Sequence, residues 1–188
     1  MKRFLNIISL FILISFFGMI LLLIGIGWIF WTYGQKLPDY NQLSKYEPAV
    51  VSRVYAGNGA LLAEFAKEKR VFVPIQSIPP LIIEAFLSAE DKNFFNHIGI
   101  DFKALTKASI RNLKNYNSGK RALGASTITQ QIAKNFLLSS DYSFERKIKE
   151  AILSLRIERA FSKDHILELY LNEIYLGYGS YGVAAASI

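Results

Sequence analysis

The pattern of apolar and polar positions divides the chain into an apolar start, a short alternating stretch and a long helical remainder. No charged residue occurs between Arg3 and Lys36. This run exceeds the roughly 20 apolar residues that cross a bilayer as a helix. We therefore predict a transmembrane helix over residues 4–33, preceded by a tail of residues 1–3.

A cleaved signal peptide is the competing interpretation of this segment. Its apolar region would be only about 7–15 residues long and would end at a small-residue cleavage site. The observed run is longer, and the first alanine of the chain is Ala49. An uncleaved anchor is therefore favoured, and Lys2 and Arg3 predict a cytoplasmic N-terminus. Three aromatic residues would lie at the far interface: Trp28, Trp31 and Tyr33.

The segment after the anchor is predicted to contain a linker and then a β-hairpin. Residues 34–48 are polar and proline-containing, which is typical of a linker, and a domain is predicted over residues 49–188. Alternating apolar positions flank Asn58-Gly59, which indicates a hairpin with a two-residue turn. A third strand over residues 71–73 is expected to pair with it.

Helical periodicity dominates after Pro79-Pro80. Polar residues at helix starts support this pattern, because Thr127 with Gln130 fits a capping box, and Asp101 and Ser162 can cap other helices. The predicted helices cover residues 81–92, 101–116, 127–138, 143–161 and 162–175. A Gly/Tyr-rich turn follows, and the final "VAAASI" resembles the first turn of another helix. We therefore expect the chain to be part of a longer protein.

Composition narrows the partner classes. The chain has no cysteine, which excludes disulfides and thiolate metal sites. Its net charge is +7 and its pI is near 9.5, so nucleic acid, anionic lipid or a phosphate-bearing substrate would be attracted. A domain outside the cytoplasm argues against nucleic acid. A nucleotide site has no support either, because no phosphate-binding glycine loop is present.

The stretch "SAEDKNFFNHIGID" carries the first candidate for chemistry. Glu90 and Asp91 are adjacent at a predicted helix end, so their side chains point in different directions. A solvated helix end is the ordinary interpretation of such a pair. Phe94 and Phe95 favour another interpretation, in which they partly desolvate the acid and raise its pKa, as general acid–base catalysis requires.

A second polar group borders the apolar stripes of two later helices. Arg146 and Lys147 lie about one turn from Glu150, so both cations can reach its carboxylate. A solvated, ion-paired helix face is the alternative interpretation. In the preceding helix, polar side chains lie beside Ile128 and Ile132 in the same way: Gln130, Gln131 and Lys134.

Other catalytic arrangements find little support. His97 and His165 are far apart in sequence and fit hydrogen-bonding roles better than metal ligation. No Gly-x-Ser-x-Gly elbow occurs, and no Ser-x-x-Lys or Lys-Thr-Gly motif of penicillin-reactive serine enzymes occurs.

Four ordered motifs resemble those of the peptidoglycan glycosyltransferase domain, family 51, of class A penicillin-binding proteins and monofunctional transglycosylases. They are "EDKNFFNHIGI", "GASTITQQIAKN", "RKIKEAILSLRIE" and "KDHILELYLNEIYLG". The linker "LPDYNQLSKYEP" and the hairpin "VSRVYAGNGALLAEF" are similar to the 1A type of these proteins. A fifth family motif, and a transpeptidase domain that would make the full-length protein bifunctional, would lie beyond Ile188.

The resemblance implies a mainly α fold: a lysozyme-like lobe with a small jaw lobe and a short N-terminal β-hairpin, after one transmembrane helix. It also implies polymerisation of lipid II into β-1,4 glycan strands with release of undecaprenyl pyrophosphate. Glu90 would be the general base, and Glu150 would orient cations or help hold a divalent ion, Mg²⁺ or Mn²⁺. Lys134, Arg146 and Lys147 would bind the pyrophosphate. The remaining implied substrate-binding residues are Asp91, Phe94, His97, Gly99, Ser126, Thr127, Gln130, Gln131 and Asn135.

The expected location is the bacterial cytoplasmic (inner) membrane, with one span and the catalytic domain on the periplasmic side. Expected partners are lipid II, the growing glycan strand, membrane lipids, and other proteins of cell-wall synthesis, division or elongation, with no nucleic acid and no organic cofactor. Two alternatives remain open. One is an anchored peptidoglycan-cleaving enzyme of lysozyme-like fold, which would have no pyrophosphate to bind. The other is a non-catalytic cell-wall scaffold.

Overall fold

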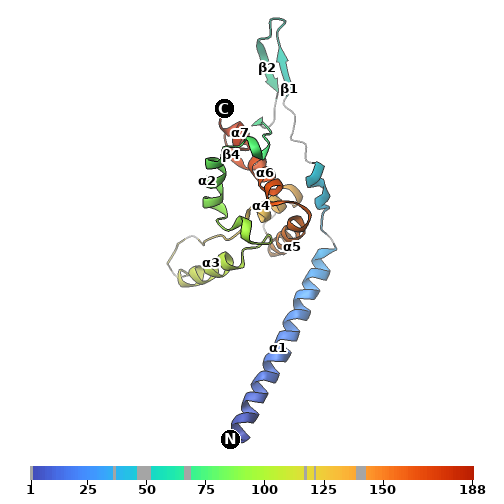
Figure 1. The fold of residues 1–188 in the computed structure, drawn as a ribbon, viewed down its shortest axis with the longest axis vertical. Helices are drawn as coiled ribbons and strands as arrows, with labels where there is room; N and C mark the ends of the chain where they lie inside the picture. Colours follow the sequence, from blue (N-terminus) through green and yellow to red (C-terminus); the bar gives the residue numbers. More distant parts are fainter. Residues whose placement is uncertain are drawn as a thin grey trace. The chain divides into compact units, whose positions relative to one another are not determined.

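A computed structural model describes most of the chain. The described residues are 2–35, 37–45, 52–65, 69–116, 118–120, 122–138 and 143–188. They fall into two compact units, Met1–Leu37 and Pro38–Ile188 (Figure 1). The predicted mainly α class is confirmed, because helices greatly outweigh the short strands.

The first unit is a single helix, α1, over Lys2–Gly34. Its part from Ile8 to Gly34 is long and apolar enough to cross a membrane. Large apolar side chains cover it on every side, as expected for a helix surrounded by lipid. The predicted apolar helix is therefore present, with slightly wider bounds.

The second unit begins with the short 3₁₀ helix η1 (Tyr40–Lys45), inside the stretch predicted as a linker. Leu43 is only 1% exposed, and η1 contacts α5 (Phe144–Ala160). Part of the polar linker is therefore packed onto the helical unit, because one leucine in it has an apolar site to fill.

The predicted β-hairpin is present as β1 (Ser52–Tyr55) and β2 (Leu61–Phe65), which pair antiparallel. The predicted two-residue turn is wrong. Ala56 and Gly59 are joined by a backbone hydrogen bond, and Gly59 has a φ of +82°, whereas Asn58 keeps a negative φ. This is a three-residue loop in which a tight turn is followed by a left-handed glycine.

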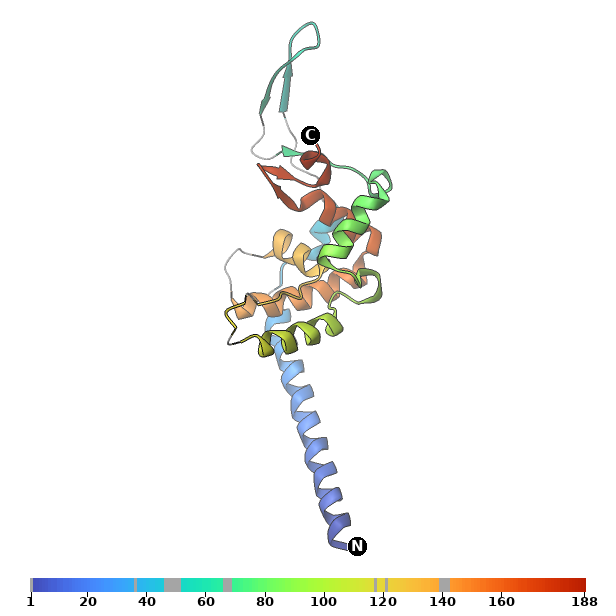
Figure 2. The same cartoon turned by 90° about the vertical axis from the view of Figure 1, so that its left-hand side faces the viewer.

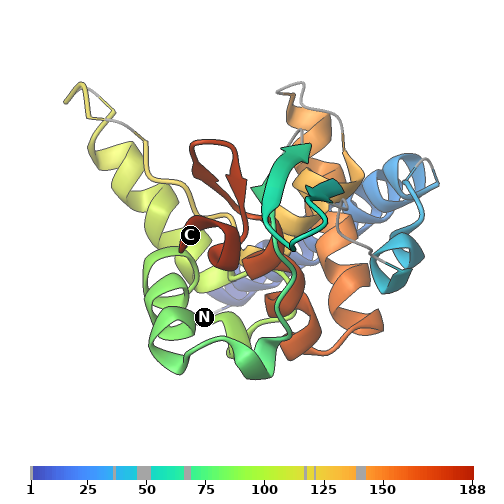
Figure 3. The same cartoon turned by 90° about the horizontal axis from the view of Figure 1, so that it is seen from above.

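The helical remainder contains α2 (Pro80–Glu90), α3 (Phe102–Lys114), α4 (Ile128–Leu137), α5, α6 (Lys163–Glu173) and α7 (Val183–Ala186). Short 3₁₀ helices η2 (Ile75–Ser77) and η3 (Phe94–Asn96) precede and follow α2. The view turned by 90° shows α4, α5 and α6 stacked together (Figure 2). Seen from above, α2 and α3 lie on one side of this stack (Figure 3).

The core lies where α4, α5 and α6 meet. Its side chains occupy the stripes that the helical period predicts. They are almost completely buried: Ile128, Ile132, Leu153, Ile157, Ile166, Leu167, Leu169, Tyr170 and Leu171. The predicted caps are present as well, including the Thr127–Gln130 capping box and the Ser162 cap.

The second sheet was not predicted. It joins β3 (Lys69–Arg70), β5 (Ser180–Tyr181) and β4 (Tyr175–Gly177) in that order. The expected strand over residues 71–73 is wrong, because the side-chain amide of Asn172 binds both the N–H and the C=O of Val73. This amide attaches the segment before α2 to α6.

Candidate functional site

Glu90 lies at the last position of α2, and its side chain is exposed. Its Oε2 accepts a hydrogen bond of 2.9 Å from Nε2 of Gln131 on α4. The exposure of Glu90 favours the interpretation as a solvated helix end over partial desolvation by Phe94 and Phe95. Phe94 is instead 1% exposed beneath the following loop, where it packs edge-on against Phe95 and His97.

Asp91, unlike its neighbour Glu90, is buried. The two side chains therefore point in different directions, as expected. It accepts hydrogen bonds from Nε2 of His97 at 2.9 Å and from the backbone N–H of Ile128 at 3.0 Å. The N–H of Gly99 donates to Nδ1 of His97, so the neutral tautomer with its hydrogen on Nε2 satisfies both contacts. Asp91 therefore ties the loop after Glu90 to the start of α4.

Thr127 strengthens the same connection. Its hydroxyl donates to the carbonyl of Gly99 at 2.6 Å and accepts from the N–H of Gln130. The side chain of Gln130 in turn accepts from the N–H of Thr127. The polar groups of these residues hydrogen-bond to one another, which fixes the loop in place. Direct contact with substrate stays a prediction.

Glu150 lies on α5 and is 1% exposed. Its two oxygens face Nζ of Lys147 at 2.6 Å and Nε of Arg146 at 3.3 Å. The alternative of a solvated ion-paired face is therefore wrong for this group. The Lys147 ammonium also lies 3.4 Å from the hydroxyl of Ser126. The Lys147 side chain remains 39% exposed, while that of Arg146 is 11% exposed.

A cavity of about 470 Å³ is lined by Glu90 and by Ser126, whose hydroxyl lies 3.4 Å from Nζ of Lys147. Basic side chains from the loop after α2 and from α3 also line it: Lys92, Lys103 and Lys107. These lysines were not predicted as site residues, because the sequence pattern does not indicate which cavity an exposed lysine faces.

The end of α4 continues the site beyond Gln131. Lys134 and Asn135 follow Gln131 by three and four residues, so they lie on the same face of the helix. Among the described residues, Lys134 has neither a hydrogen-bond partner nor an ion-pair partner. The carboxylate of Glu90, the amide of Gln131 and the ammonium of Lys134 thus follow one another along the same side of α4.

A family model described as Transglycosylase matches residues 58–188. The chain belongs to the transglycosylase family. Penicillin-binding protein 1A of Rickettsia felis is 53% identical over 182 residues, which cover 95% of this chain and 23% of that protein. The proteins of the same name from Aquifex aeolicus and Escherichia coli are 48% and 42% identical, over 81% and 88% of this chain. These matches confirm the predicted resemblance to glycosyltransferase domains of the 1A type, and with it the enzyme class.

This transglycosylase chain spans about a fifth of the length of the relatives that it matches: 23%, 21% and 20% of the three proteins named above. The match therefore concerns one domain and the segment before it.

A divalent ion does not fit the Glu150 group of this transglycosylase. Metal sites for Mg²⁺ collect several oxygen ligands. The two oxygens of Glu150 already face cationic side chains, and no cluster of three His, Asp or Glu occurs among the described residues.

Asp101 should contribute to the stability of the transglycosylase in a pH-dependent way. It caps α3 by accepting from the N–H of Ala104, and it accepts from the amide of Asn93; these bonds hold the pKa of its carboxyl below the ordinary value of 3.8. Asp101→Ala should cost about 0.5–2 kcal/mol at pH 7. Because the pKa is lowered on folding, this difference should persist above about pH 4 and shrink as the pH falls through the folded-state pKa. Denaturant unfolding at several pH values measures it, and a difference that does not change with pH would contradict the assignment.

Proposed function

We propose that this domain polymerises lipid II into β-1,4 glycan strands and releases undecaprenyl pyrophosphate. The observation that carries the proposal is the position of Glu90: an exposed carboxylate at the rim of a cavity whose wall also contains lysines. Family membership supports the same reaction class. An acid beside cations suits a reaction that removes a proton from one sugar and loses an anion from another.

Glu90 acts as the general base of this reaction. The 4-hydroxyl oxygen of the acceptor sugar attacks the anomeric carbon of the donor, and its proton passes to the Glu90 carboxylate. The bond from the anomeric carbon to the pyrophosphate oxygen breaks, and the leaving group takes that electron pair. Attack from the opposite face inverts the α-anomeric centre. Gln131 orients the carboxylate through its 2.9 Å hydrogen bond.

The leaving pyrophosphate needs positive charge rather than a proton. Lys134 is suited to this role, since its ammonium has no partner among the described residues and lies one turn beyond Gln131. Lys147 is accessible enough to contribute as well. Arg146 is mostly buried against Glu150, so it acts by holding that carboxylate in place, and Glu150 in turn holds Lys147 near Ser126.

The apolar helix α1 anchors this activity at a membrane, where the lipid substrate resides. We propose one span in the cytoplasmic membrane, with residues 34–188 on the periplasmic side. The basic charge would favour anionic headgroups. We further propose that the full-length protein also carries a transpeptidase and associates with other cell-wall synthesis proteins. Its similarity to penicillin-binding proteins 1A supports this extension.

The proposal is tested by incubating the detergent-solubilised full-length protein with labelled lipid II and separating the products by size. Glycan polymer is the expected result. Absence of polymer would contradict the proposed reaction. Release of fragments from preformed glycan, without polymer, would instead favour the cleaving enzyme.

Lys134→Met should lower polymer synthesis by about 10²-fold, as expected when one preorganised group that stabilises the leaving charge is removed. Thermal stability should be unchanged, because Lys134 has no ion pair or hydrogen bond with described residues to lose. Initial rates at several lipid II concentrations measure the effect. Lys114→Met, at the exposed end of α3, is the matched control and should keep the wild-type rate. A wild-type rate for Lys134→Met would rule out its role at the pyrophosphate.

A further inference from the structure

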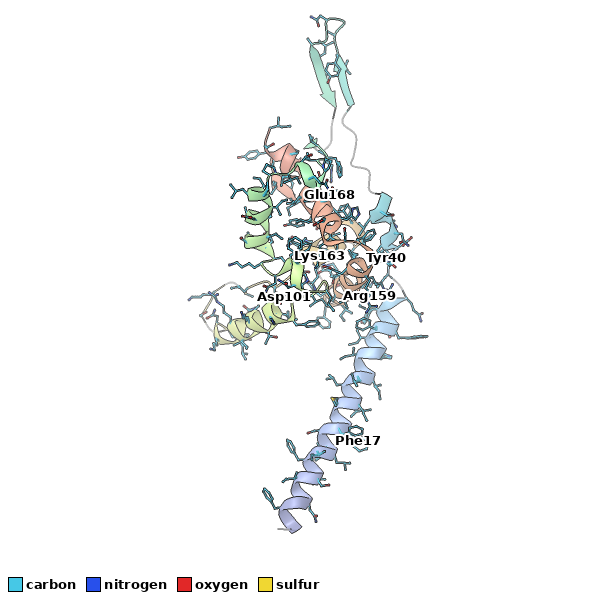
Figure 4. The ribbon with its side chains drawn as sticks, in the orientation of Figure 1. Phe17, Tyr40, Asp101, Arg159, Lys163 and Glu168 are labelled. Carbon is cyan, nitrogen blue, oxygen red and sulfur yellow. The ribbon has the colours of Figure 1, made fainter. Side chains whose placement is uncertain are left out.

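An ion pair that the proposed reaction does not use lies behind the loop that follows Glu90. It joins Glu158 on α5 to Lys163, the first residue of α6, with 2.8 Å between Nζ and Oε1. The side chains of Lys163 and Glu158 are 23% and 7% exposed. Figure 4 labels Lys163 where α6 begins, and Asp101 at the end of the loop. The largely buried carboxylate of Glu158 is costly to desolvate, so the other contacts of the pair are informative.

Lys163 binds the loop directly. Its Nζ donates a hydrogen bond of 2.8 Å to the carbonyl oxygen of His97. The same ammonium lies 4.4 Å from the centre of the Phe94 ring. One cation thus holds both the buried aromatic side chain and the backbone of the loop, and the carboxylate of Glu158 fixes the position of that cation.

Glu158 extends the connection to α4 and to the far end of the loop. Its Oε1 also accepts a 2.6 Å hydrogen bond from the buried hydroxyl of Thr129. Gly99 packs so closely on α5 that a Cβ atom there would lie 2.7 Å from the carbonyl oxygen of Ser154 and 3.1 Å from Cγ of Glu158. Its φ of +100° is also one that favours glycine. The loop therefore cannot move toward α5, and Lys163 prevents it from moving away.

These contacts reach the candidate catalytic groups in two steps. His97, whose carbonyl Lys163 binds, donates from its ring to Asp91, which directly follows Glu90. Glu150 lies on the same helix as Glu158, about two turns earlier. The ion pair thus joins the helix that bears Glu150 to the loop that determines where Glu90 lies.

We propose that Glu158 and Lys163 are positioning residues, which set the placement of Glu90 relative to the Glu150 group. They act through His97 and Asp91 and touch no substrate. The inference rests on the proposed glycosyltransferase reaction. Since the pair fixes geometry at the reacting centre, its loss should lower kcat more than it raises KM.

The test uses the double variant Glu158→Gln/Lys163→Met in the full-length protein. Removing both charges avoids a buried carboxylate without a partner, and the amide oxygen introduced on α5 can still accept from Thr129. Apart from the ion pair itself, only the bond to the His97 carbonyl and the ring contact are lost. We expect a Tm close to that of the wild type, a fall in kcat of tenfold or more, a change in KM below threefold, and faster amide hydrogen exchange at residues 94–99.

Three further variants complete the experiment. Glu158→Gln alone weakens the hold on Lys163 but leaves an amide oxygen that can still accept from it, so it should lower kcat less than the double variant does. Glu145→Gln/Lys149→Met removes a more exposed ion pair of α5, whose nitrogen–oxygen distance is 2.7 Å, and should leave kcat unchanged. If the double variant does not fold, Lys163→Arg is used in its place. The guanidinium group is larger than the ammonium and keeps the charge, so it should displace the loop and lower kcat at least threefold.

The outcomes separate the two hypotheses. If the wild type forms no polymer, the proposed function is wrong. If the wild type is active and the folded double variant, or Lys163→Arg in its place, has the wild-type kcat, the positioning role is wrong. A kcat that falls only in proportion to lost stability would also overturn it, because the pair would then serve folding alone.

Discussion

Glu90→Gln should lower the rate of glycan polymerisation by about 10²–10⁴-fold, the usual contribution of a general base. The amide cannot accept the proton of the acceptor hydroxyl. It keeps the size of the side chain and can still accept the hydrogen bond from Gln131. Since Glu90 is exposed, thermal stability should change by less than about 0.5 kcal/mol. Lipid II polymerisation and thermal unfolding, measured on the same preparation, separate the two effects.

Glu84→Gln is the matched control for this experiment. Glu84 is also an exposed glutamate on α2, but it does not line the cavity. Its substitution should leave the rate within about twofold of the wild type. Polymerisation by Glu90→Gln at the wild-type rate would show that the base is another residue, and the cavity beside Glu90 would need another role.

The elements that sequence analysis predicted well are those with local determinants. The capping box of Thr127 and the caps Asp101 and Ser162 each need only residues within one helical turn, so their patterns are readable directly. The apolar helix α1 is likewise readable from its own composition. In the second sheet, the pairing of β3 with β5 was missed because it joins strands more than a hundred residues apart, and no short sequence pattern encodes such a contact. The adjacent strands β4 and β5 lie in the stretch that was predicted as a Gly/Tyr-rich turn.

The candidate site was predicted unevenly for the same reason. Arg146 and Lys147 share a helix with Glu150, so their contacts with it follow from spacing, but the burial of that carboxylate depends on packing by other elements. The exposure of Glu90 stayed open between two interpretations, because the sequence does not indicate that Phe94 packs into the core. The contact between Lys163 and the His97 carbonyl was invisible, since the lysine follows an ordinary helix cap.

Glu150→Ala is expected to have the largest effect on stability of any single change at the site. It removes the carboxylate that faces both Arg146 and Lys147, and it leaves a buried cation without that partner. Breaking a buried ion pair in this way costs about 3–5 kcal/mol. For a unit of this size the Tm should fall by roughly 6–20 °C. Thermal unfolding of the detergent-solubilised protein measures the change.

Polymerisation by Glu150→Ala should also fall, even well below its Tm, because Lys147 loses the group that holds it near Ser126. Glu150→Gln separates the contributions: its amide oxygen still accepts from Lys147, so it should fold better than the alanine variant while remaining less active than the wild type. Glu145→Ala, on the exposed face of α5, should cost less than about 1 kcal/mol. If Glu150→Ala were as stable as Glu145→Ala, the buried ion pair would not be the main electrostatic support of this helix. If it were unstable but fully active at low temperature, Glu150 would serve folding alone, and Lys134 would carry the larger share of leaving-group stabilisation.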